Sequence, residues 1–214
     1  MLLYSDDTSP WCAPVRAAIY AKGLDVKIAS PPDGMKSEAY RRISVTGTIP
    51  CLVLDDGAPL PESAVILTYL DEKFPDRPLA PADPEGRACV ALLQRLAEQG
   101  VLVPLVQFFH DMSASDPNAG ATARERLGAG LDRLEHFIAD DGYATGPNFT
   151  RADCVLGPAL FGVPAMGGLM GDTQLLARRP KLAAYAGRVS QHPAVAKVLG
   201  ELQAALAASG MAAG

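Results

Sequence analysis

The sequence predicts an α/β domain followed by an all-α domain, and three observations lead to this fold class. Short apolar runs of strand length alternate with helical patterns through residues 1–77. Prolines then fall at positions 75, 78, 81 and 84, and a helix does not continue through such a series. Beyond residue 85 the apolar residues recur at helical spacing, and no strand is needed. We therefore expect a first domain over residues 1–77, a linker over 78–84 and a helical domain over 85–214.

The first half begins with a short apolar run, residues 1–4, which is typical of a buried strand. A helix is expected to begin near Pro10, because proline fits the first helical turn, and to end at Gly23. Alternation over residues 25–29 predicts a second strand, and a short helix is expected over residues 37–43.

The stretch from Thr46 to Glu72 carries the clearest functional pattern. Ile49-Pro50 precedes an apolar run of strand length at 51–54, a tight turn at 55–57 and an extended segment at 58–60. A helix then opens at Glu62-Ser63, with Ser63 expected as its N-cap.

This arrangement suits a ligand with an amino-acid end. A helix N-terminus carries partial positive charge and free N–H groups, so it receives a carboxylate well. Glu62 adds an acceptor for an ammonium group, and Ser63 adds a hydroxyl donor. A cis Ile49–Pro50 bond would turn the N–H and C=O of Ile49 outward, where a peptide could pair with them as an added strand.

The second half is predicted to be helical throughout. A long amphipathic helix over 85–109, broken near residues 100–104, is followed by a polar loop at 113–120 and a helix at 122–139. Thr150 to Asp153 has the pattern of a capping box and leads into a helix at 154–161. Residues 164–171 are rich in small residues and are expected to be mobile. Residues 181–206 are expected to be mostly helical, and His136 and His192 are expected at the surface.

The stretch 46–72 resembles the glutathione-binding half of the soluble glutathione S-transferases, in which a cis-proline, a β-hairpin and a Glu/Gln-Ser pair hold the tripeptide. The segments GPNFTRADCVLGPAL and RRPKLAAYAGRVSQHPAV resemble the C-terminal domain of that family, so the resemblance covers nearly the whole chain and is weakest between residues 86 and 144. It implies a serine-type, bacterial-like member with a thioredoxin-like domain built on a mixed four-stranded sheet. It also implies a homodimer, glutathione as co-substrate and a small apolar electrophile as second substrate.

The reaction of this family needs a thiolate, and the pKa of a free thiol is about 8.5. Ser9, in the context Ser-Pro-Trp, resembles the serine that donates a hydrogen bond to the glutathione sulfur, and we expect it to be catalytic. The resemblance assigns glutathione binding to Ser9, Lys36, Thr48, Ile49, Pro50, Glu62 and Ser63. The second-substrate pocket is expected to include Trp11, Phe108 and Met112.

Two other residues are candidates for the catalytic role given to Ser9, and one interpretation of the sequence involves no catalysis. Cys12 is the alternative nucleophile for a glutathione-dependent thiol reductase, although it occupies the resolving position of a C-x-x-C pattern. Tyr4 is a further candidate, because other branches of the family use a tyrosine near the end of the first strand. A non-catalytic glutathione-binding or scaffold protein would keep the same fold.

The composition argues against several classes of function. The net charge of −5 argues against a nucleic-acid surface, which requires clustered Lys and Arg. The four cysteines form no C-x-x-C pair and have no histidine at ligand spacing, so we expect free thiols and no metal site. With no basic leader at the N-terminus and no apolar run judged long enough to span a membrane, the expected location is the cytoplasm, with no membrane partner.

Overall fold

The computed structural model describes residues 1–115 and 117–208. The chain divides into two compact units, the first made of residues 1–79 together with 196–208, and the second made of residues 80–195. The linker expected over 78–84 spans the point where the first unit gives way to the second. The last six residues of the expected helical domain lie outside the described residues.

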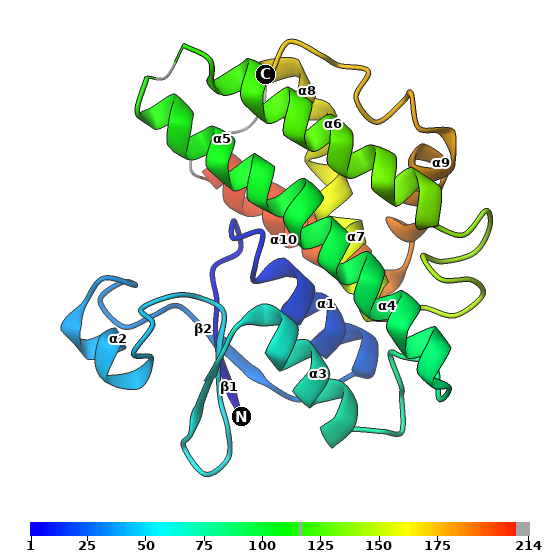
Figure 1. Ribbon diagram of the computed structural model, residues 1–214. Coiled ribbons are helices and arrows are strands. Elements are labelled where there is room, and N and C mark those ends of the chain that lie inside the picture. The colour runs from blue at the N-terminus through cyan, green and yellow to red at the C-terminus, as the bar shows by residue number, and fades with distance from the viewer. Residues whose placement is uncertain (116, 209–214) are drawn as a thin grey trace. The chain divides into compact units, whose positions relative to one another are not determined.

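The first unit is a mixed four-stranded sheet with helices (Figure 1). Its strands and its first helices are β1 (Leu2–Tyr4), α1 (Ala13–Lys22), β2 (Lys27–Ala29), α2 (Glu38–Ile43), β3 (Cys51–Val53), β4 (Pro59–Pro61) and α3 (Ser63–Lys73). The strand order is β2-β1-β3-β4, with β1 parallel to β2 and the other two pairings antiparallel. This is the thioredoxin-like arrangement that the sequence predicted.

The core of the first unit joins the sheet to α1 and α3, which lie side by side (Figure 1). Leu3 pairs with Leu52 across β1 and β3, and both side chains are buried. Val15 and Ile19 of α1 and Ile66 of α3 pack in the same cluster. The apolar periodicity of the sequence therefore describes this core. The core in turn holds the strands and helices whose ends form the candidate site described below.

Two helices of the first unit begin at other residues than the sequence predicted. Helix α1 begins at Ala13 rather than near Pro10, because residues 10–12 form a turn in which the Ser9 carbonyl accepts hydrogen bonds from the N–H groups of Cys12 and Ala13. Helix α3 begins at Ser63 itself, and the N-cap position belongs to Glu62, whose φ is 73°. That backbone region is uncommon for a residue other than glycine.

The second unit is helical in all of its named elements, as predicted. These are α4 (Pro84–Ala97), the π-helical segment η1 (Glu98–Leu102), α5 (Val103–Ser113), α6 (Ala119–Phe137), α7 (Arg151–Phe161), α8 (Val163–Leu169) and α9 (Pro180–Val189). Helix α10 (Pro193–Ala208) begins in this unit and continues in the first. The break expected near residues 100–104 is thus a π-helical turn that joins α4 to α5 without an interruption of the helix.

Two glycines approach each other closely where the π-helical turn meets α6. A Cβ atom on Gly130 of α6 would lie 2.0 Å from the carbonyl oxygen of Gly100, and a Cβ on Gly100 would lie 2.7 Å from the Cα of Gly130. Such distances leave no room for any side chain at either position. The backbones of η1 and α6 are therefore in direct contact.

The expected capping box at the start of α7 is present. The Asp153 carboxylate is buried and accepts hydrogen bonds from Thr150 N (2.7 Å), Thr150 Oγ1 (2.9 Å), Ala144 N (2.8 Å) and Tyr185 Oη (2.9 Å). Burial raises the pKa of Asp153, while the donors from Ala144, Thr150 and Tyr185 act in the opposite direction. The box therefore joins α7 to the preceding loop and to α9.

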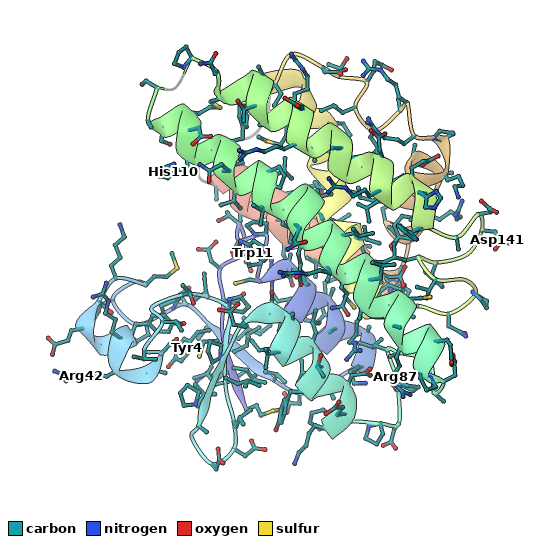
Figure 2. All side chains as sticks on the ribbon, in the orientation of Figure 1. Tyr4, Trp11, Arg42, Arg87, His110 and Asp141 are labelled. Atoms are coloured by element: carbon teal, nitrogen blue, oxygen red, sulfur yellow. The ribbon has the colours of Figure 1, made fainter. Side chains whose placement is uncertain are left out.

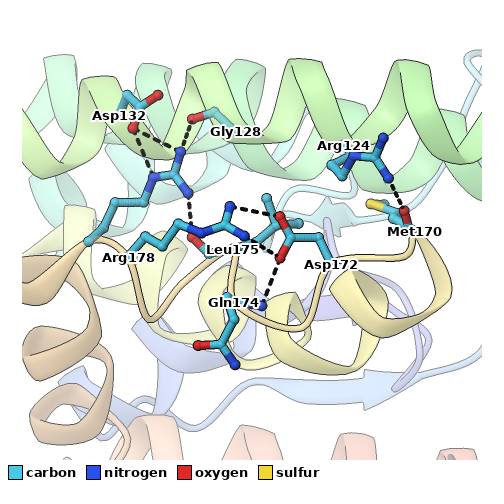
Figure 3. A network of polar contacts seen from close by, with 9 residues as sticks. Arg124, Gly128, Asp132, Met170, Asp172, Gln174, Leu175 and Arg178 are labelled. Atoms are coloured by element: carbon cyan, nitrogen blue, oxygen red, sulfur yellow. Dashed lines mark hydrogen bonds and ion pairs between the residues drawn. The ribbon is translucent and has the colours of Figure 1, made fainter.

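The stretch 164–171, expected to be mobile, is mostly the short helix α8, in which Val163 and Met166 are buried. The segment after α8 is tied to α6 by arginines (Figure 3). Arg124 donates to the carbonyl oxygen of Met170 (2.9 Å), and Arg179 donates to Asp132 Oδ1 (2.9 Å from Nε) and to the Gly128 carbonyl oxygen (3.0 Å). These ties give the small-residue stretch a defined structure.

The structure also corrects the expected position of His192, which is half-buried rather than on the surface. Its ring stacks on Phe149 with 3.7 Å between centroids, and Tyr143 meets it edge-on at 5.9 Å. Its Nδ1 is buried without a hydrogen-bond partner among the described atoms. Burial lowers the pKa of His192 below its ordinary value. His136, in contrast, is exposed as expected.

Two helical stretches are long and apolar enough to span a membrane by length and composition alone, contrary to the sequence expectation. They are Pro84–Ser113 and Arg151–Leu169. Their most apolar windows are 56% and 67% buried inside the fold. The core helices of soluble proteins pass the same test, so this finding is weak support for a membrane-spanning role.

Candidate functional site

A pocket of about 210 Å³ in the first unit brings together six of the residues predicted from the sequence. It is lined by Trp11, Thr48, Ile49, Pro50, Glu62 and Ser63. These residues come from the turn before α1, from the segment before β3 and from the start of α3. The elements of the stretch 46–72 thus fold back on one another around a single cavity.

The Ile49–Pro50 peptide bond is cis, as the sequence reading required. Among the hydrogen bonds between described residues, neither the N–H nor the C=O of Ile49 takes part. Both groups belong to a residue that lines the pocket. They can pair with the backbone of an extended peptide, in the manner of a strand added to a sheet edge.

Tyr40 fixes the segment that precedes the cis bond, and the sequence reading did not single it out. Its hydroxyl donates to the carbonyl oxygen of Thr48 (2.7 Å), and its ring packs edge-on against Tyr4 with 5.4 Å between centroids. Burial raises the pKa of Tyr40 to about 12, so the hydroxyl keeps its proton. The only signal in the sequence is an aromatic residue within a short helix that also holds Glu38, Arg41 and Arg42. Thr48 donates its own hydroxyl to Thr46 Oγ1 (2.9 Å).

The N-terminus of α3 forms the polar end of the pocket. Ser63 is the first residue of the helix and is 8% exposed, while the preceding Glu62 is exposed. The first N–H groups of a helix have no partner within the helix, and they carry partial positive charge. The positive φ of Glu62 sets the direction of its side chain relative to the helix. A carboxylate can therefore bind at Ser63 while an ammonium group binds at Glu62.

Ser9 lies near this pocket in sequence but is not one of its lining residues, whereas Trp11 is. The Cys12 thiol, three residues along the chain from Ser9, is fully buried. Burial raises the pKa of Cys12, and this effect exceeds the lowering by Ser9, by the Asp6 backbone and by the charge of Arg16. A nucleophilic cysteine needs an exposed thiol and a lowered pKa, so the observed environment of Cys12 favours a packing role.

Trp11 and Tyr4, both labelled in Figure 2, belong to the turn before α1 and to the end of β1. Lys36 is exposed in the loop before α2 and does not line the pocket. Phe108 is buried in the second unit at 2% exposure, while Met112 is 47% exposed on the same helix, α5. The second-substrate pocket with Trp11, Phe108 and Met112 stays a prediction, as does glutathione binding by Lys36.

Another pocket, of about 260 Å³, lies in the second unit and includes none of the predicted site residues. It is lined by Gln99, Gly100, Val103, Pro104, Glu125, Arg126, Ala129 and Arg133. Its charged side chains are Glu125, Arg126 and Arg133, and it has no cis peptide bond beside it for an extended peptide. Within residues 1–115 and 117–208, no group of three or more His, Cys, Asp or Glu side chains is arranged to hold a metal ion.

Two family models match the chain. The model described as glutathione S-transferase, N-terminal domain, matches residues 3–78, and the model described as glutathione S-transferase, C-terminal domain, matches residues 89–188. Together they cover most of both units. The first match includes the whole pocket described above.

Individual proteins agree with the family models. A stringent starvation protein A homolog from Coxiella burnetii is 33% identical over 170 residues, 78% of each chain. A maleylacetoacetate isomerase from Pseudomonas aeruginosa is 30% identical over 208 residues, which cover 91% of this chain and 96% of the relative. A glutathione S-transferase structure from Methylobacterium radiotolerans, in complex with glutathione sulfonate, is 26% identical with a TM-score of 0.77, and the match covers 92% of this chain and 93% of that one. The chain described here therefore belongs to the glutathione S-transferase family.

Proposed function

We propose that this protein is a glutathione transferase that activates the glutathione thiolate for attack on an apolar electrophile. The observation that carries the proposal is the pocket in which the cis Ile49–Pro50 bond lies beside the N-terminus of α3, with Glu62 and Ser63 on its wall. This pocket suits the γ-glutamyl end and the peptide middle of glutathione at once. The relatives whose structures hold glutathione or its sulfonate support the same ligand.

In the proposed mechanism, the α-carboxylate of the γ-glutamyl group binds at Ser63 and the α3 N-terminus, and its ammonium binds Glu62. The cysteinyl backbone pairs with the N–H and C=O of Ile49. Ser9 donates its hydroxyl hydrogen bond to the sulfur and favours the thiolate, whose proton passes to solvent. The sulfur then forms a bond to the electrophilic carbon, and the leaving group departs with the bonding electron pair.

Isomerisation of a maleyl compound is a second candidate. It is favoured by the maleylacetoacetate isomerase of Pseudomonas aeruginosa, because that similarity extends over 91% of this chain. In such a reaction the glutathione thiolate adds to a double bond and later leaves, so glutathione is regenerated. The Ser-Ser-Cys pattern of zeta-type isomerases is absent from residues 9–12, which read Ser-Pro-Trp-Cys.

The deciding experiment is calorimetric titration of glutathione into the wild type, Glu62→Ala and Ser9→Ala, followed by turnover of an aryl halide and of a maleyl substrate. We expect saturable binding that Glu62→Ala abolishes and that Ser9→Ala largely retains. Turnover should fall in both variants. Thr68→Ala, on the exposed side of α3, is the control for a substitution beside that helix but away from the pocket.

The alternatives give different results in the same experiment. Binding without turnover of either substrate would favour a non-catalytic glutathione-binding or scaffold protein. Activity that is lost in Cys12→Ala and kept in Ser9→Ala would favour thiol reduction through Cys12. No binding to the wild type at millimolar glutathione would refute the transferase proposal. We further propose that the protein acts as a homodimer in the cytoplasm, and light scattering after gel filtration tests the dimer.

A further inference from the structure

A buried arginine on α1 connects the loop that carries Ser9 to the C-terminal helix. Arg16 is 1% exposed, yet it carries a full charge. Its guanidinium donates through Nη1 to Asp7 Oδ1 and to Glu201 Oε2 (2.7 Å), and through Nη2 to the Asp7 carbonyl oxygen (3.0 Å). Its Nε is buried without a hydrogen-bond partner among the described atoms. All of these residues belong to the first unit.

The partner on α10 is itself held in place. Tyr20, one turn along α1 from Arg16, donates its hydroxyl to Glu201 Oε1 (2.8 Å). Burial and the neighbouring Glu201 raise the pKa of Tyr20, so the hydroxyl keeps its proton and remains a donor. The Lys197 ammonium lies 3.7 Å from the centre of the Tyr20 ring. Glu201 therefore meets two donors of α1 at once, 185 residues away from Arg16 in the sequence.

The loop on the other side of Arg16 leads directly to Ser9. The N–H of Ser9 donates to the Asp6 carbonyl oxygen (3.2 Å), and the N–H of Thr8 donates to Asp6 Oδ1 (2.8 Å). The Ser9 carbonyl in turn accepts from Cys12 N (3.1 Å). Arg16 binds Asp7, which lies within this hydrogen-bonded loop, through both a side-chain and a backbone oxygen. Movement of Asp7 would therefore shift the Ser9 hydroxyl.

We propose that Arg16, held between Asp7 and Glu201, is a positioning residue that sets the place of the Ser9 hydroxyl, so that helix α10 controls thiolate activation. The inference rests on the proposed function, because it assigns Ser9 to the glutathione sulfur. Removal of Glu201 leaves the buried guanidinium with Asp7 as its one acidic partner among the described residues and leaves the Tyr20 hydroxyl without its acceptor. The loop that Arg16 holds then loses its support from α10.

A second buried ion pair on the same helix provides a matched control. Lys22, at the other end of α1, is 4% exposed and its ammonium lies 3.0 Å from Asp71 Oδ1. The Lys22 ammonium also donates to the carbonyl oxygen of Arg77, so the partners recorded for it among the described residues lie outside the loop 5–9. Lys22→Met should therefore cost stability, as Glu201→Ala should, without any effect on Ser9. Val198 and Leu199 of α10 are buried, so the helix should keep its place in Glu201→Ala.

The first measurement needs no ligand. Amide hydrogen exchange of Thr8, Ser9 and Cys12 is compared in the wild type, Glu201→Ala and Lys22→Met. We expect exchange at these amides to rise about tenfold in Glu201→Ala and less than about twofold in Lys22→Met. Equal exchange in the wild type and Glu201→Ala would overturn the proposal, and so would an equal rise in both variants.

The second measurement follows the bound glutathione thiolate by its ultraviolet absorbance against pH, together with steady-state kinetics. In Glu201→Ala we expect kcat to fall about tenfold, the KM for glutathione to stay within about twofold, and the pKa of the bound thiol to rise. Glu201→Gln, which keeps an oxygen for Arg16, should recover part of kcat. A fall in the thiol pKa would show that Glu201 acts through its charge and would refute a positioning role. Failure of the wild type to bind glutathione would refute the proposed function, while the exchange result would still decide whether α10 holds the loop.

Discussion

The buried carboxylate of Asp153 gives the sharpest test of the reasoning, through the substitution Asp153→Asn. Each carboxylate oxygen accepts from one backbone N–H, Oδ1 from Ala144 and Oδ2 from Thr150, and each also accepts from one hydroxyl. Asparagine has the same size but only one acceptor oxygen. Whichever way the amide is turned, its NH₂ group faces one of the two backbone N–H groups.

The magnitude follows from this count. One buried backbone N–H loses its acceptor and faces the asparagine NH₂ instead, while the neighbouring hydroxyl, of Thr150 or of Tyr185, can turn to accept from that NH₂. We therefore expect Asp153→Asn to lower the free energy of unfolding by about 1–3 kcal/mol. Tyr185→Phe removes a single donor and leaves Ala144 N on the same oxygen, so about 1 kcal/mol is expected.

The assay is urea unfolding followed by far-ultraviolet circular dichroism. The chain has one tryptophan, Trp11, which belongs to the first unit, so its fluorescence reports the unfolding of that unit separately. The reasoning is refuted if Asp153→Asn costs less than Tyr185→Phe. It is also refuted if Asp153→Asn is as stable as the wild type, because the count of donors would then not determine the stability of the box.

Three further predictions test other parts of the structure. Gly130→Ala should lower the free energy of unfolding by about 3 kcal/mol, because its Cβ would meet the Gly100 carbonyl oxygen at 2.0 Å. Gly128→Ala on the same helix should be neutral or stabilising, because the nearest atom to its Cβ would lie at 3.6 Å. Urea unfolding of both variants checks this. His192 keeps a lowered pKa in the fold, so the unfolded chain binds more protons as the pH falls below about 6.5, and stability should decline through that window. His192→Phe should reduce this decline in thermal unfolding measured between pH 7 and pH 5, and an unchanged slope would contradict the assignment. Ser63→Ala should raise the Kd for glutathione about tenfold or more, through loss of a hydrogen bond to a carboxylate, while an unchanged Kd in calorimetry would exclude Ser63 from the head-group site.

Local patterns in the sequence predict most of the fold. The apolar runs at Leu2–Tyr4 and Cys51–Val53 are strands because both are buried in one sheet, and the pattern of Thr150 and Asp153 is a capping box because both of its hydrogen bonds close within four residues. The pocket is predictable for the same reason, since five of its six lining residues lie within the stretch 46–72.

The departures from the sequence reading come from interactions between distant residues. Proline fits the first turn of a helix, but the turn at residues 10–12 delays α1 until Ala13. His192 is half-buried because Tyr143 and Phe149, more than forty residues earlier, stack around it. The two glycines of α8 are weak helix formers, yet the buried Val163 and Met166 and the bond from Arg124 to Met170 hold that segment.

The sequence also gives no sign of the contact between Arg16 and Glu201, and this contact has a consequence for how the protein is made. A chain emerging from a ribosome presents residues 1–79 long before it presents residue 201. During that time the first unit can form its sheet and its cis-proline loop, but the charge of Arg16 has Asp7 and not yet Glu201 as a partner. The unit that holds the proposed glutathione site therefore gains this contact only once residue 201 has been synthesised. A chain truncated after α9 would keep the pocket residues Ile49, Glu62 and Ser63, but Arg16 would lack Glu201, and the Ser9 loop would lack the support that we propose for α10.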